Sequence, residues 1–476
     1  MRIVFAASEA APFIKTGGLG DVAEALPVAL SKIKDNEVIL FLPYYSKIKN
    51  NLSIETEFVK SFAVDIAWRR QHVGVFKYKS RKKKLQVYFL DNEYYFNRGS
   101  EYGQTDDGER FTYFSKALLE SLVNLDIIPD IIHCNDWQTA LIPVFLHAFY
   151  HEKLGKAKTV FTIHNIEYQG WCDPYFLSDT MGLGENYRNM LTYNNSINFM
   201  KGAILCTDAL TTVSKTYAQE IKYPYFAHGL APIIEEHSFK IDGVVNGINL
   251  EINNPATDKA LVANYGINDF EKGKAQNKAA LQERLGLEVR ADVPLIAMVS
   301  RIVSHKGFEL ICDIAREFLK QDVQLVILGT GEASYENFLQ NIANSNRRKF
   351  SLNLCFDSSL ASQIYASSDI YLMPSKSEPC GLSQLIAMRY GTIPVVNATG
   401  GLKDTVIPFD GKENGTGFNF QTFSREDLLD ALNRCLGVYR NDKASWNKII
   451  SNAMSLDSSW DKPAKEYMEI YKKCLA

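Results

Sequence analysis

Two cations and a carboxylate follow strands that we expect in the second half of the chain. Arg301 and Lys306 lie in SRIVSHKG, directly after the apolar run Leu295–Val299. Glu378 lies in MPSKSEPCGLSQL, between a strand end and the glycine-marked start of an amphipathic helix. Cations at the carboxyl end of a parallel strand can neutralise a departing diphosphate. A carboxylate there can bind sugar hydroxyls or stabilise positive charge at an anomeric carbon. A surface turn is an equally weighted alternative for Arg301 and Lys306.

A glycine-rich turn follows the first expected strand, Ile3–Ala6. In KTGGLGDVAEAL, Gly18, Gly20 and Ala23 match G-x-G-x-x-A at the start of a helix. Uncovered backbone amides at such a place suit a pyrophosphate, and Lys15 adds a positive charge just ahead of them. A tight strand-to-helix turn needs glycine for steric reasons alone, and this alternative has equal weight.

Polar and aromatic side chains follow two more expected strands, Ile131–His133 and Thr159–Ile163. They are Asn135, Asp136, Trp137, His164 and Asn165. An aromatic face can cover a sugar ring while paired polar groups bind its hydroxyls. Packing at a helix start is the alternative for Trp137. His164 has two alternatives, a hydrogen-bonded core histidine and a metal ligand. The sequence places no partner ligands beside it at zinc spacing, which disfavours the metal ligand.

Further glycine-bearing turns follow strands in the second half. Gly329 could close a nucleotide pocket or simply turn the chain, and the second interpretation is favoured. The segment Asn397–Val406, NATGGLKDTV, can present backbone amides to a phosphate or a sugar. Cys380 stands two residues after Glu378, but the sequence places no base for it, so a small packed thiol is favoured over a nucleophile.

Short apolar runs alternate with helical patterns throughout, which is typical of β-α-β units around a parallel sheet. In the first half, strands are expected at Ile3–Ala6, Val38–Leu42, Ile131–His133 and Thr159–Ile163, and helices at Val22–Ile33 and Leu141–Phe149. In the second half, strands are expected at Leu295–Val299, Gln324–Leu328, Leu352–Phe356, Ile370–Met373 and Ile393–Val396. This pattern predicts two doubly wound, Rossmann-like α/β domains.

The domain boundary is expected in VVNGINLEINNP, which is rich in Asn, Gly and Pro. The chain of 476 residues exceeds the roughly 250–300 residues at which single cores stop growing. We therefore expect an N-terminal domain over 1–250 and a C-terminal domain over 251–458. The tail, 459–476, is expected to form a helix that packs back across the boundary onto the first domain.

Composition excludes several classes of function. The formal net charge of −3 gives no basic field of the kind that nucleic-acid binding requires. One basic run, from Lys79 to Lys84, separates the alternating segments His72–Tyr78 and Leu85–Leu90, so a solvated turn of a hairpin is expected there.

The eight cysteines form no C-x-x-C pair and no Cys/His cluster at zinc spacing, which indicates neither a disulfide framework nor a metal site. The apolar run at the N-terminus is too short for a signal-peptide core, and no segment has the length of a membrane span. We expect a cytoplasmic protein, or a plastid protein if a transit peptide has been removed.

Seven motifs cover nearly the whole chain in one order. Between residues 15 and 406 stand KTGGLGD, the NDW turn, HNIEYQG, NGIN, SRIVSHKG, PSKSEPCGLSQL and TGGLKDTV. Together they resemble the bacterial glycogen synthase and plant starch synthase family, glycosyltransferase family five. The resemblance implies the GT-B fold, with two Rossmann-like domains facing each other across a deep cleft. It also implies a retaining enzyme that moves glucose from ADP-glucose to the non-reducing end of an α-1,4-glucan or maltooligosaccharide, releases ADP and needs no metal or other cofactor.

The resemblance assigns roles to residues at the matching positions. The catalytic set would be His164, Glu378, Arg301, Lys306 and Lys15, with His164 supporting an oxocarbenium-like transition state. The donor would contact Lys15, Gly17, Gly18, Arg301, Lys306, Gly329, Phe356, Glu378, Cys380, Gly381, Leu382, Thr399, Gly400 and Gly401. The acceptor would contact Asp21, Tyr95, Asn135, Asp136, Trp137, Asn165 and Asn246.

Two segments depart from the family pattern. The chain has NDWQ where members often have HDWH, so no role of that histidine transfers to this sequence. Phe356 and Asp357 stand where the family commonly has a tyrosine near the adenine, and LASQ replaces a Leu-Ser-His turn. Phe356 can still stack on a base, and the resemblance favours ADP-glucose over UDP-glucose.

The alternatives are another GT-B enzyme, such as a UDP-glucose transferase, an epimerase or a phosphorylase, and a non-catalytic glucan-binding homologue. The charged set of Lys15, Arg301, Lys306 and Glu378 argues against the second, because sugar binding alone requires no diphosphate site. A dinucleotide dehydrogenase is disfavoured because Pro43, and no acidic residue, follows the strand at 38–42.

Overall fold

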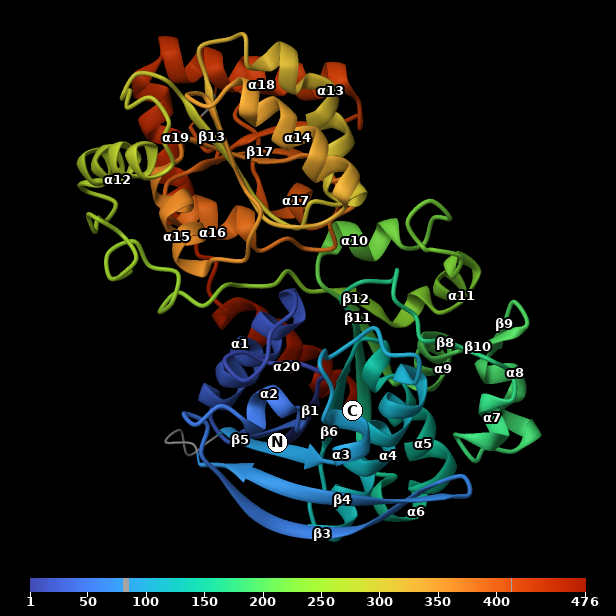
Figure 1. Ribbon diagram of the computed structural model, residues 1–476. Helices are drawn as coiled ribbons and strands as arrows, with labels where there is room; N and C mark the ends of the chain where they lie inside the picture. Colours follow the sequence, from blue (N-terminus) through green and yellow to red (C-terminus); the bar gives the residue numbers. More distant parts are fainter. Residues whose placement is uncertain (80–84, 412) are drawn as a thin grey trace. The chain divides into compact units, whose positions relative to one another are not determined.

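The computed structural model describes residues 1–79, 85–411 and 413–476 (Figure 1). It divides into two compact units, and each has its own sheet. Unit 1 comprises Met1–Asn246 together with Trp460–Ala476, and unit 2 comprises Gly247–Ser459. The basic run at 81–84, expected as a solvated turn, lies outside the described residues.

Unit 1 is built on a sheet of nine described strands in the order β12-β11-β7-β6-β1-β2-β5-β4-β3. The parallel strands are β1 (Arg2–Ala6), β2 (Glu37–Pro43), β5 (Leu85–Asp91), β6 (Ile131–Asn135), β7 (Lys158–Ile163), β11 (Ala209–Thr212) and β12 (Ile241–Gly243). At one edge, β3 (Thr56–Ile66) and β4 (Arg69–Tyr78) run antiparallel. The predicted pairing of 72–78 with 85–90 is confirmed as the antiparallel pair β4–β5.

Helices of unit 1 connect these strands. They are α1 (Gly18–Lys32), α2 (Ser46–Lys49), α3 (Glu93–Phe96), α4 (Asp107–Asn124), α5 (Leu141–Phe149), α6 (His151–Leu154), α7 (Phe176–Asp179), α8 (Arg188–Leu191), α9 (Phe199–Cys206), α10 (Lys215–Glu220) and α11 (Ala231–Glu236). A small sheet joins β8 (Trp171–Cys172), β10 (Ser196–Asn198) and β9 (Thr192–Tyr193).

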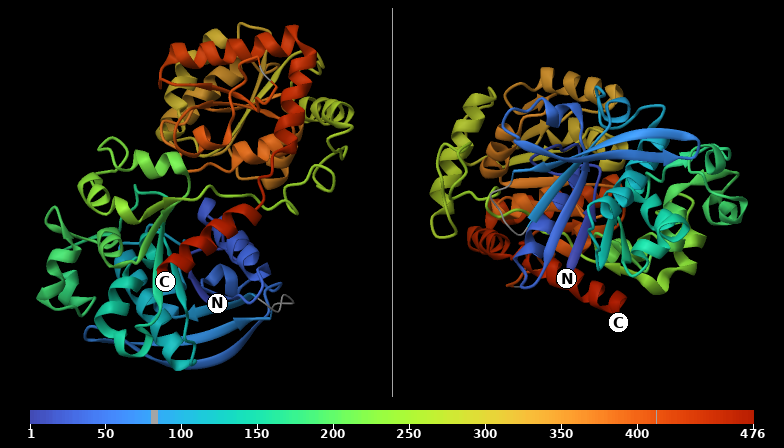
Figure 2. Two further views of the ribbon diagram at one scale, coloured as in Figure 1. Left: turned by 180° about the vertical axis from the view of Figure 1, so that it is seen from behind. Right: turned by 90° about the horizontal axis from the view of Figure 1, so that it is seen from below.

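The C-terminal tail belongs to unit 1, where α20 (Asp461–Leu475) packs against α1 and β7. Figure 2 shows this red helix lying beside the blue α1. The Tyr471 hydroxyl is 2.7 Å from His133 Nδ1, inside the core. The last helix is thus fixed by a buried polar contact as well as by its apolar face.

Unit 2 has a six-stranded, all-parallel sheet in its described residues, in the order β15-β14-β13-β16-β17-β18. The strands are β13 (Leu295–Val299), β14 (Gln324–Leu328), β15 (Phe350–Asn353), β16 (Ile370–Met373), β17 (Ile393–Asn397) and β18 (Phe418–Phe420). The helices are α12 (Phe270–Arg284), α13 (Phe308–Phe318), α14 (Ala333–Ser345), α15 (Ser358–Ser367), α16 (Ser383–Arg389), α17 (Gly400–Thr405), α18 (Arg425–Asn441) and α19 (Lys443–Ser455). Its apolar strands are buried on both faces, as parallel strands are.

One predicted strand, Leu352–Phe356, is wrong in its bounds. The strand β15 begins at Phe350 and ends at Asn353, while the Phe356 side chain is 91% exposed. Asp357 then caps α15, since its carboxylate accepts a hydrogen bond from the Leu360 amide at 2.9 Å. The apolar residues after 353 therefore belong to a helix-entry turn and not to the sheet.

Each sheet has one point at which its winding reverses. In unit 1 the chain proceeds from β1 to β2 on one side and then returns to β6 on the other. In unit 2 it proceeds from β13 to β14 and returns to β16. Open α/β sheets bind ligands at the carboxyl ends of the strands beside such switch points. The structure thus singles out the loops after β1, β6, β13 and β16.

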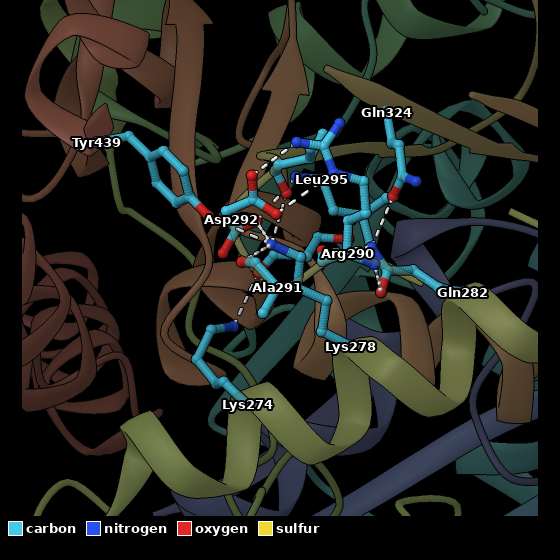
Figure 3. Close-up of polar contacts among 12 residues, drawn as sticks. Lys274, Lys278, Gln282, Arg290, Ala291, Asp292, Leu295, Gln324 and Tyr439 are labelled. Carbon is cyan, nitrogen blue, oxygen red and sulfur yellow. Dashed lines mark hydrogen bonds and ion pairs between the residues drawn. The ribbon is translucent and has the colours of Figure 1, made fainter. Parts of the chain in front are cut away.

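A polar stripe on α12 attaches this helix to unit 2. Figure 3 shows Lys274, Lys278 and Gln282 projecting from one side of α12, as a spacing of four residues requires. The Lys274 ammonium donates to the carbonyls of Ala366, Ser368 and Tyr390 at 2.8–3.2 Å, and burial lowers its pKa to about 7. Most core-facing helices pack through an apolar face, whereas α12 is attached largely by the hydrogen bonds of its polar stripe.

Lys278 forms a buried ion pair with Asp369 at 2.7 Å and also donates to the Val293 carbonyl at 2.6 Å. The same Asp369 oxygen accepts from the Leu295 amide at 2.8 Å, at the first residue of β13. The pair therefore connects α12 to the amino-terminal edge of the sheet.

Replacing Lys278 by methionine is expected to lower the free energy of unfolding by about 3–5 kcal/mol, because Asp369 would remain buried without its cation. Urea unfolding followed by tryptophan fluorescence measures the change. Lys272→Met, at an exposed position of the same helix, is the control and should change stability by less than about 0.5 kcal/mol. Equal stability of the two variants would contradict the role of the ion pair.

Among the residues that the model describes, no helix combines the length and the apolar character that crossing a membrane demands.

Candidate active site

The switch point of unit 2 holds a partly buried ion pair between two residues singled out from the sequence. Lys306 ends the short 3-10 turn η4 (Ser304–Lys306) after β13, and Glu378 lies in the loop after β16. Lys306 Nζ is 2.6 Å from Glu378 Oε2, and the Ser375 hydroxyl donates to the same oxygen at 2.9 Å. Glu378 is only 5% exposed. A carboxylate this buried is tolerated because a cation and a hydroxyl meet its charge.

Two helix starts lie against the Glu378 loop. Gly381 and Leu382 lead into α16, and Thr399 and Gly400 lead into α17. The Gly401 amide donates to the Glu378 carbonyl at 3.0 Å. A Cβ atom at Gly401 would lie 2.2 Å from the Cys380 carbonyl oxygen, so the two loops approach as closely as they do only because residue 401 is glycine.

Three other predicted donor residues, Arg301, Gly329 and Cys380, lie in the turns that follow β13, β14 and β16. Arg301 follows β13 and its side chain is exposed. Cys380 is buried, at 4% exposure. Gly329 passes so close to the backbone of residue 300 that a Cβ would lie 1.8 Å from the Ser300 carbonyl oxygen. That contact supports the chain-turning role of Gly329.

In unit 1, the carboxyl ends of β6 and β7 bring four predicted residues together. Asp136 Oδ1 accepts hydrogen bonds from the backbone amides of His164 and Asn165, at 2.8 and 3.4 Å. His164 Nε2 is 2.9 Å from Asn135 Oδ1. Asp136 has a positive φ of 56°, which is uncommon outside glycine and indicates that its contacts hold a strained backbone.

The hydrogen bonds assign the tautomer of His164. Asn135 Nδ2 donates to the Ala6 carbonyl at 3.0 Å, so Asn135 Oδ1 is left to accept from His164. His164 Nε2 therefore carries the proton. Burial lowers the pKa of His164 to about 3 and raises the pKa of Asp136 to about 7. The imidazole is thus neutral at physiological pH.

The glycine turn after β1 is organised around Glu9, a residue that sequence reasoning missed. Glu9 Oε2 accepts from the Thr16 amide at 2.6 Å and from its hydroxyl at 2.5 Å. Glu9 Oε1 accepts from the amides of Gly17 and Gly20, at 3.2 and 3.0 Å. The Gly17 and Gly20 amides are thus already hydrogen-bonded to a carboxylate, which favours the steric alternative for this turn, and the donor role of Gly17 and Gly18 stays a prediction. Spacing alone gives no signal for this contact.

Lys15 and Asp21, on either side of the turn, form an exposed ion pair at 2.7 Å. Gly18 is the first residue of α1. These three residues are at the surface at the carboxyl end of β1, where the sequence placed them, and Lys15 and Asp21 are open to a ligand.

Two predicted acceptor contacts do not fit their positions. Tyr95 and Asn135 have no exposed side-chain surface, so neither can touch a glucan in this conformation. Tyr95 donates its hydroxyl to Glu109 at 2.6 Å, while Asn135 holds His164. Tyr95 packs against the rings of Phe96 and Tyr113, and Asn135 is the last residue of the buried strand β6, which explains the difference.

Trp137 is half-buried and meets Phe111 and Phe199 edge to face, with ring centroids 5.1 and 5.9 Å apart. This supports packing at the helix start. Asn246, the last residue of the first segment of unit 1, is 6% exposed, and its Oδ1 has no hydrogen-bond partner among the described residues. Across the described ranges, no group of three or more His, Cys, Asp or Glu side chains is arranged to hold a metal ion.

The neutral state of His164 makes stability depend on pH. Its native pKa of about 3 lies below the ordinary value of 6.5, so on acidification the unfolded chain takes up a proton before the native protein does. The stability contributed by neutral His164 is complete above pH 6.5 and is lost as pH falls toward 3.

As the pH falls from 7 to 5, the low pKa of His164 should reduce the free energy of unfolding by about 2 kcal/mol. Urea unfolding of His164→Gln at the two pH values should give a difference in unfolding free energy that is smaller by that amount. His151→Gln, at an exposed position, is the control and should retain the slope of the original protein. The same slope in His164→Gln would contradict the low pKa.

Two family models match the chain. The starch synthase catalytic domain matches residues 2–236, and glycosyl transferases group 1 matches residues 282–453. The first match contains the Glu9 turn and the Asp136–His164 contact, and the second contains the Lys306–Glu378 pair.

Similar proteins of full length are glycogen synthases. The chain is 48% identical over 478 residues to that of Streptococcus mutans, covering 99% of this chain and 100% of the relative. It is 45% identical over 481 residues to that of Clostridium novyi, covering 100% and 99%.

Two solved structures are also similar. The catalytic domain of starch synthase IV from Arabidopsis thaliana, bound to ADP and acarbose, has a TM-score of 0.92 and 35% identity, with 99% of each chain covered. Sucrose-phosphate synthase from Thermosynechococcus elongatus has a TM-score of 0.62 at 15% identity, covering 99% of this chain and 98% of that one. The second resemblance concerns the fold alone.

Proposed function

Because this chain belongs to the glycogen and starch synthase family of glycosyltransferases, we propose that it transfers glucose from ADP-glucose to the non-reducing end of an α-1,4-glucan. The chain has the two-domain GT-B fold of that family. The observation that carries the proposal is the partly buried Lys306–Glu378 pair at the switch point of unit 2. ADP and acarbose, bound to the similar starch synthase IV, support an adenine nucleotide and a saccharide as the ligands here.

Arg301 and Lys306 would bind the diphosphate of the donor. Both lie in the loop after β13, and ligands of open α/β sheets bind at the carboxyl ends of the strands, where such loops begin. As the glucose–phosphate bond breaks, negative charge grows on the diphosphate, and nearby cations stabilise it by several kcal/mol at order of magnitude when water is excluded. The exposed Phe356 and the turns at 380–382 and 399–401 would contact the rest of the donor.

Glu378 would act at the glucose. Its Oε2 is held by Lys306 and Ser375, so the carboxylate is fixed without a rearrangement during reaction. A fixed negative charge near the ring stabilises positive charge at the anomeric carbon. In a retaining transfer the incoming hydroxyl arrives on the face from which the diphosphate leaves, so Glu378 has no need to attack the sugar.

His164 would lie beside the transferred sugar as a neutral group. Its Nε2 proton is bound by Asn135, and burial keeps the ring uncharged. A neutral imidazole does not oppose an oxocarbenium-like transition state, whereas an imidazolium would. Asp136 and Asn165 hold the same loop, and Lys15, Asp21 and Asn246 complete the proposed ligand-binding set of unit 1.

Release of ADP by the purified protein tests the proposal. ADP-glucose with a maltooligosaccharide should give acceptor-dependent ADP release, UDP-glucose should give much less, and EDTA should not reduce the rate because no metal is proposed. Glucan binding without release from either donor would instead indicate a non-catalytic homologue. Faster release from UDP-glucose would overturn the choice of donor.

Glu378→Gln is expected to lower kcat by about 100- to 1,000-fold, as loss of one preorganised electrostatic group does. ADP affinity, measured by calorimetry, should be unchanged or higher, because Lys306 would no longer share its charge with a carboxylate. Glu426→Gln, at an exposed position of α18, is the matched control and should retain full kcat. A Glu378→Gln enzyme within about threefold of normal kcat would refute the assigned role.

A further inference from the structure

The segment from Glu9 to Gly20 is bonded to itself more tightly than a surface turn requires. Besides the four bonds to Glu9, the Ala11 amide donates to the Gly20 carbonyl at 2.9 Å, and the Ile14 amide donates to the Ala10 carbonyl at 3.0 Å. Glu9 is 2% exposed, although it lies in the loop that follows β1. These contacts give the turn one conformation.

The conformation of this turn determines the path of the Lys15 side chain. A Cβ atom at Gly20 would lie 3.0 Å from Lys15 Cγ, so the lysine stem crosses the backbone of residue 20 at van der Waals distance. The same Gly20 amide donates to Glu9 Oε1. Displacement of Gly20 would therefore move the surface on which Lys15 rests and the start of α1 that carries Asp21.

We propose that Glu9 is a positioning residue for glucosyl transfer, acting through Lys15 by holding the glycine turn with its carboxylate. The inference rests on the proposed function, because Lys15 is assigned to the ligand-binding set there. Glu9 itself does not touch a ligand, since both of its oxygens are occupied by donors of the turn.

The charge state of Glu9 is set by opposing effects. Burial is the larger effect and raises the pKa of Glu9 above its ordinary value, while the bonds from Thr16, Gly20 and Gly17 oppose that rise. The groups that face it from neighbouring loops are Tyr45, Tyr102 and Asp136, and the charge of Glu9 helps to raise the pKa of Asp136. Three amide donors and a hydroxyl favour the carboxylate over the neutral acid, because protonation of either oxygen would place a hydrogen against the two donors of that oxygen.

Glu9→Gln tests the proposal with almost no change of volume. An amide has one oxygen, so its nitrogen must face either the Thr16 donors or those of Gly17 and Gly20. Two of the four bonds are lost in either orientation. We expect kcat/KM for ADP-glucose to fall about 10- to 100-fold, the scale of a small misplacement of a substrate-binding group. The melting temperature should also fall, because the Gln nitrogen faces two buried donors, so the assay is run at a temperature where circular dichroism shows the variant to be folded.

The double variant with Lys15→Met separates positioning from general damage. If Glu9 acts through Lys15, Glu9→Gln should reduce kcat/KM by less than about twofold in the Lys15→Met background. Glu37→Gln, on the strand β2 and paired with Arg2, is the control and should have the same small effect in both backgrounds. Equal losses from Glu9→Gln with and without Lys15 would overturn the inference, as would no loss at all.

Thr16→Val provides a second test if Glu9→Gln does not fold. It removes only the hydroxyl donor to Glu9 and should lower kcat/KM about fivefold, the value of one hydrogen bond, again only when Lys15 is present. A full effect without Lys15 would contradict the inference. Inactivity of the unaltered protein would instead refute the proposed function, so the two failures are distinguishable.

Discussion

A carboxylate withdrawn from water at the end of a parallel strand requires donors, and this requirement organises both units. In unit 1, Glu9 is satisfied by three amides and a hydroxyl of the glycine turn. In unit 2, Glu378 is satisfied by the Lys306 ammonium and the Ser375 hydroxyl. An unmatched buried charge costs several kcal/mol, so each loop must take the conformation that brings these donors to the acid. The loops that meet this demand are those that carry the proposed site.

The parallel sheets determine where the acids lie. The winding of the sheet reverses between β1 and β6 in unit 1 and between β13 and β16 in unit 2. At each of these points the loops that follow the two adjacent strands lead in opposite directions along the sheet. Glu9 follows the first strand of one such pair, and Lys306 and Glu378 follow the two strands of the other. The buried strands supply rigidity, while the loops supply polar groups. A site built in this way needs little local secondary structure, as the short turn η4 around Lys306 illustrates.

Much of this arrangement can be predicted from the sequence, because apolar runs such as Ile370–Met373 coincide with the observed strand. The motifs also identified the family, which the comparisons confirm. The error at Leu352–Phe356 arose because exposed apolar residues after Asn353 resemble a continuing strand. Tyr95 and Asn135 were expected to face a ligand, but motif membership says nothing of which side a side chain faces. Glu9 was missed because three of its four donors are backbone amides, which leave no trace in residue types.

Hydrogen exchange with and without ligand tests most directly the central claim that ligands bind at the two switch points. On addition of ADP with a maltooligosaccharide, amides in 14–20 of unit 1 and in 300–307 and 374–382 of unit 2 should exchange more slowly. The amino-terminal edges of the same sheets, such as 292–295, should be unchanged. Protection confined to those edges or to surface helices, with none in the three loops, would contradict the account.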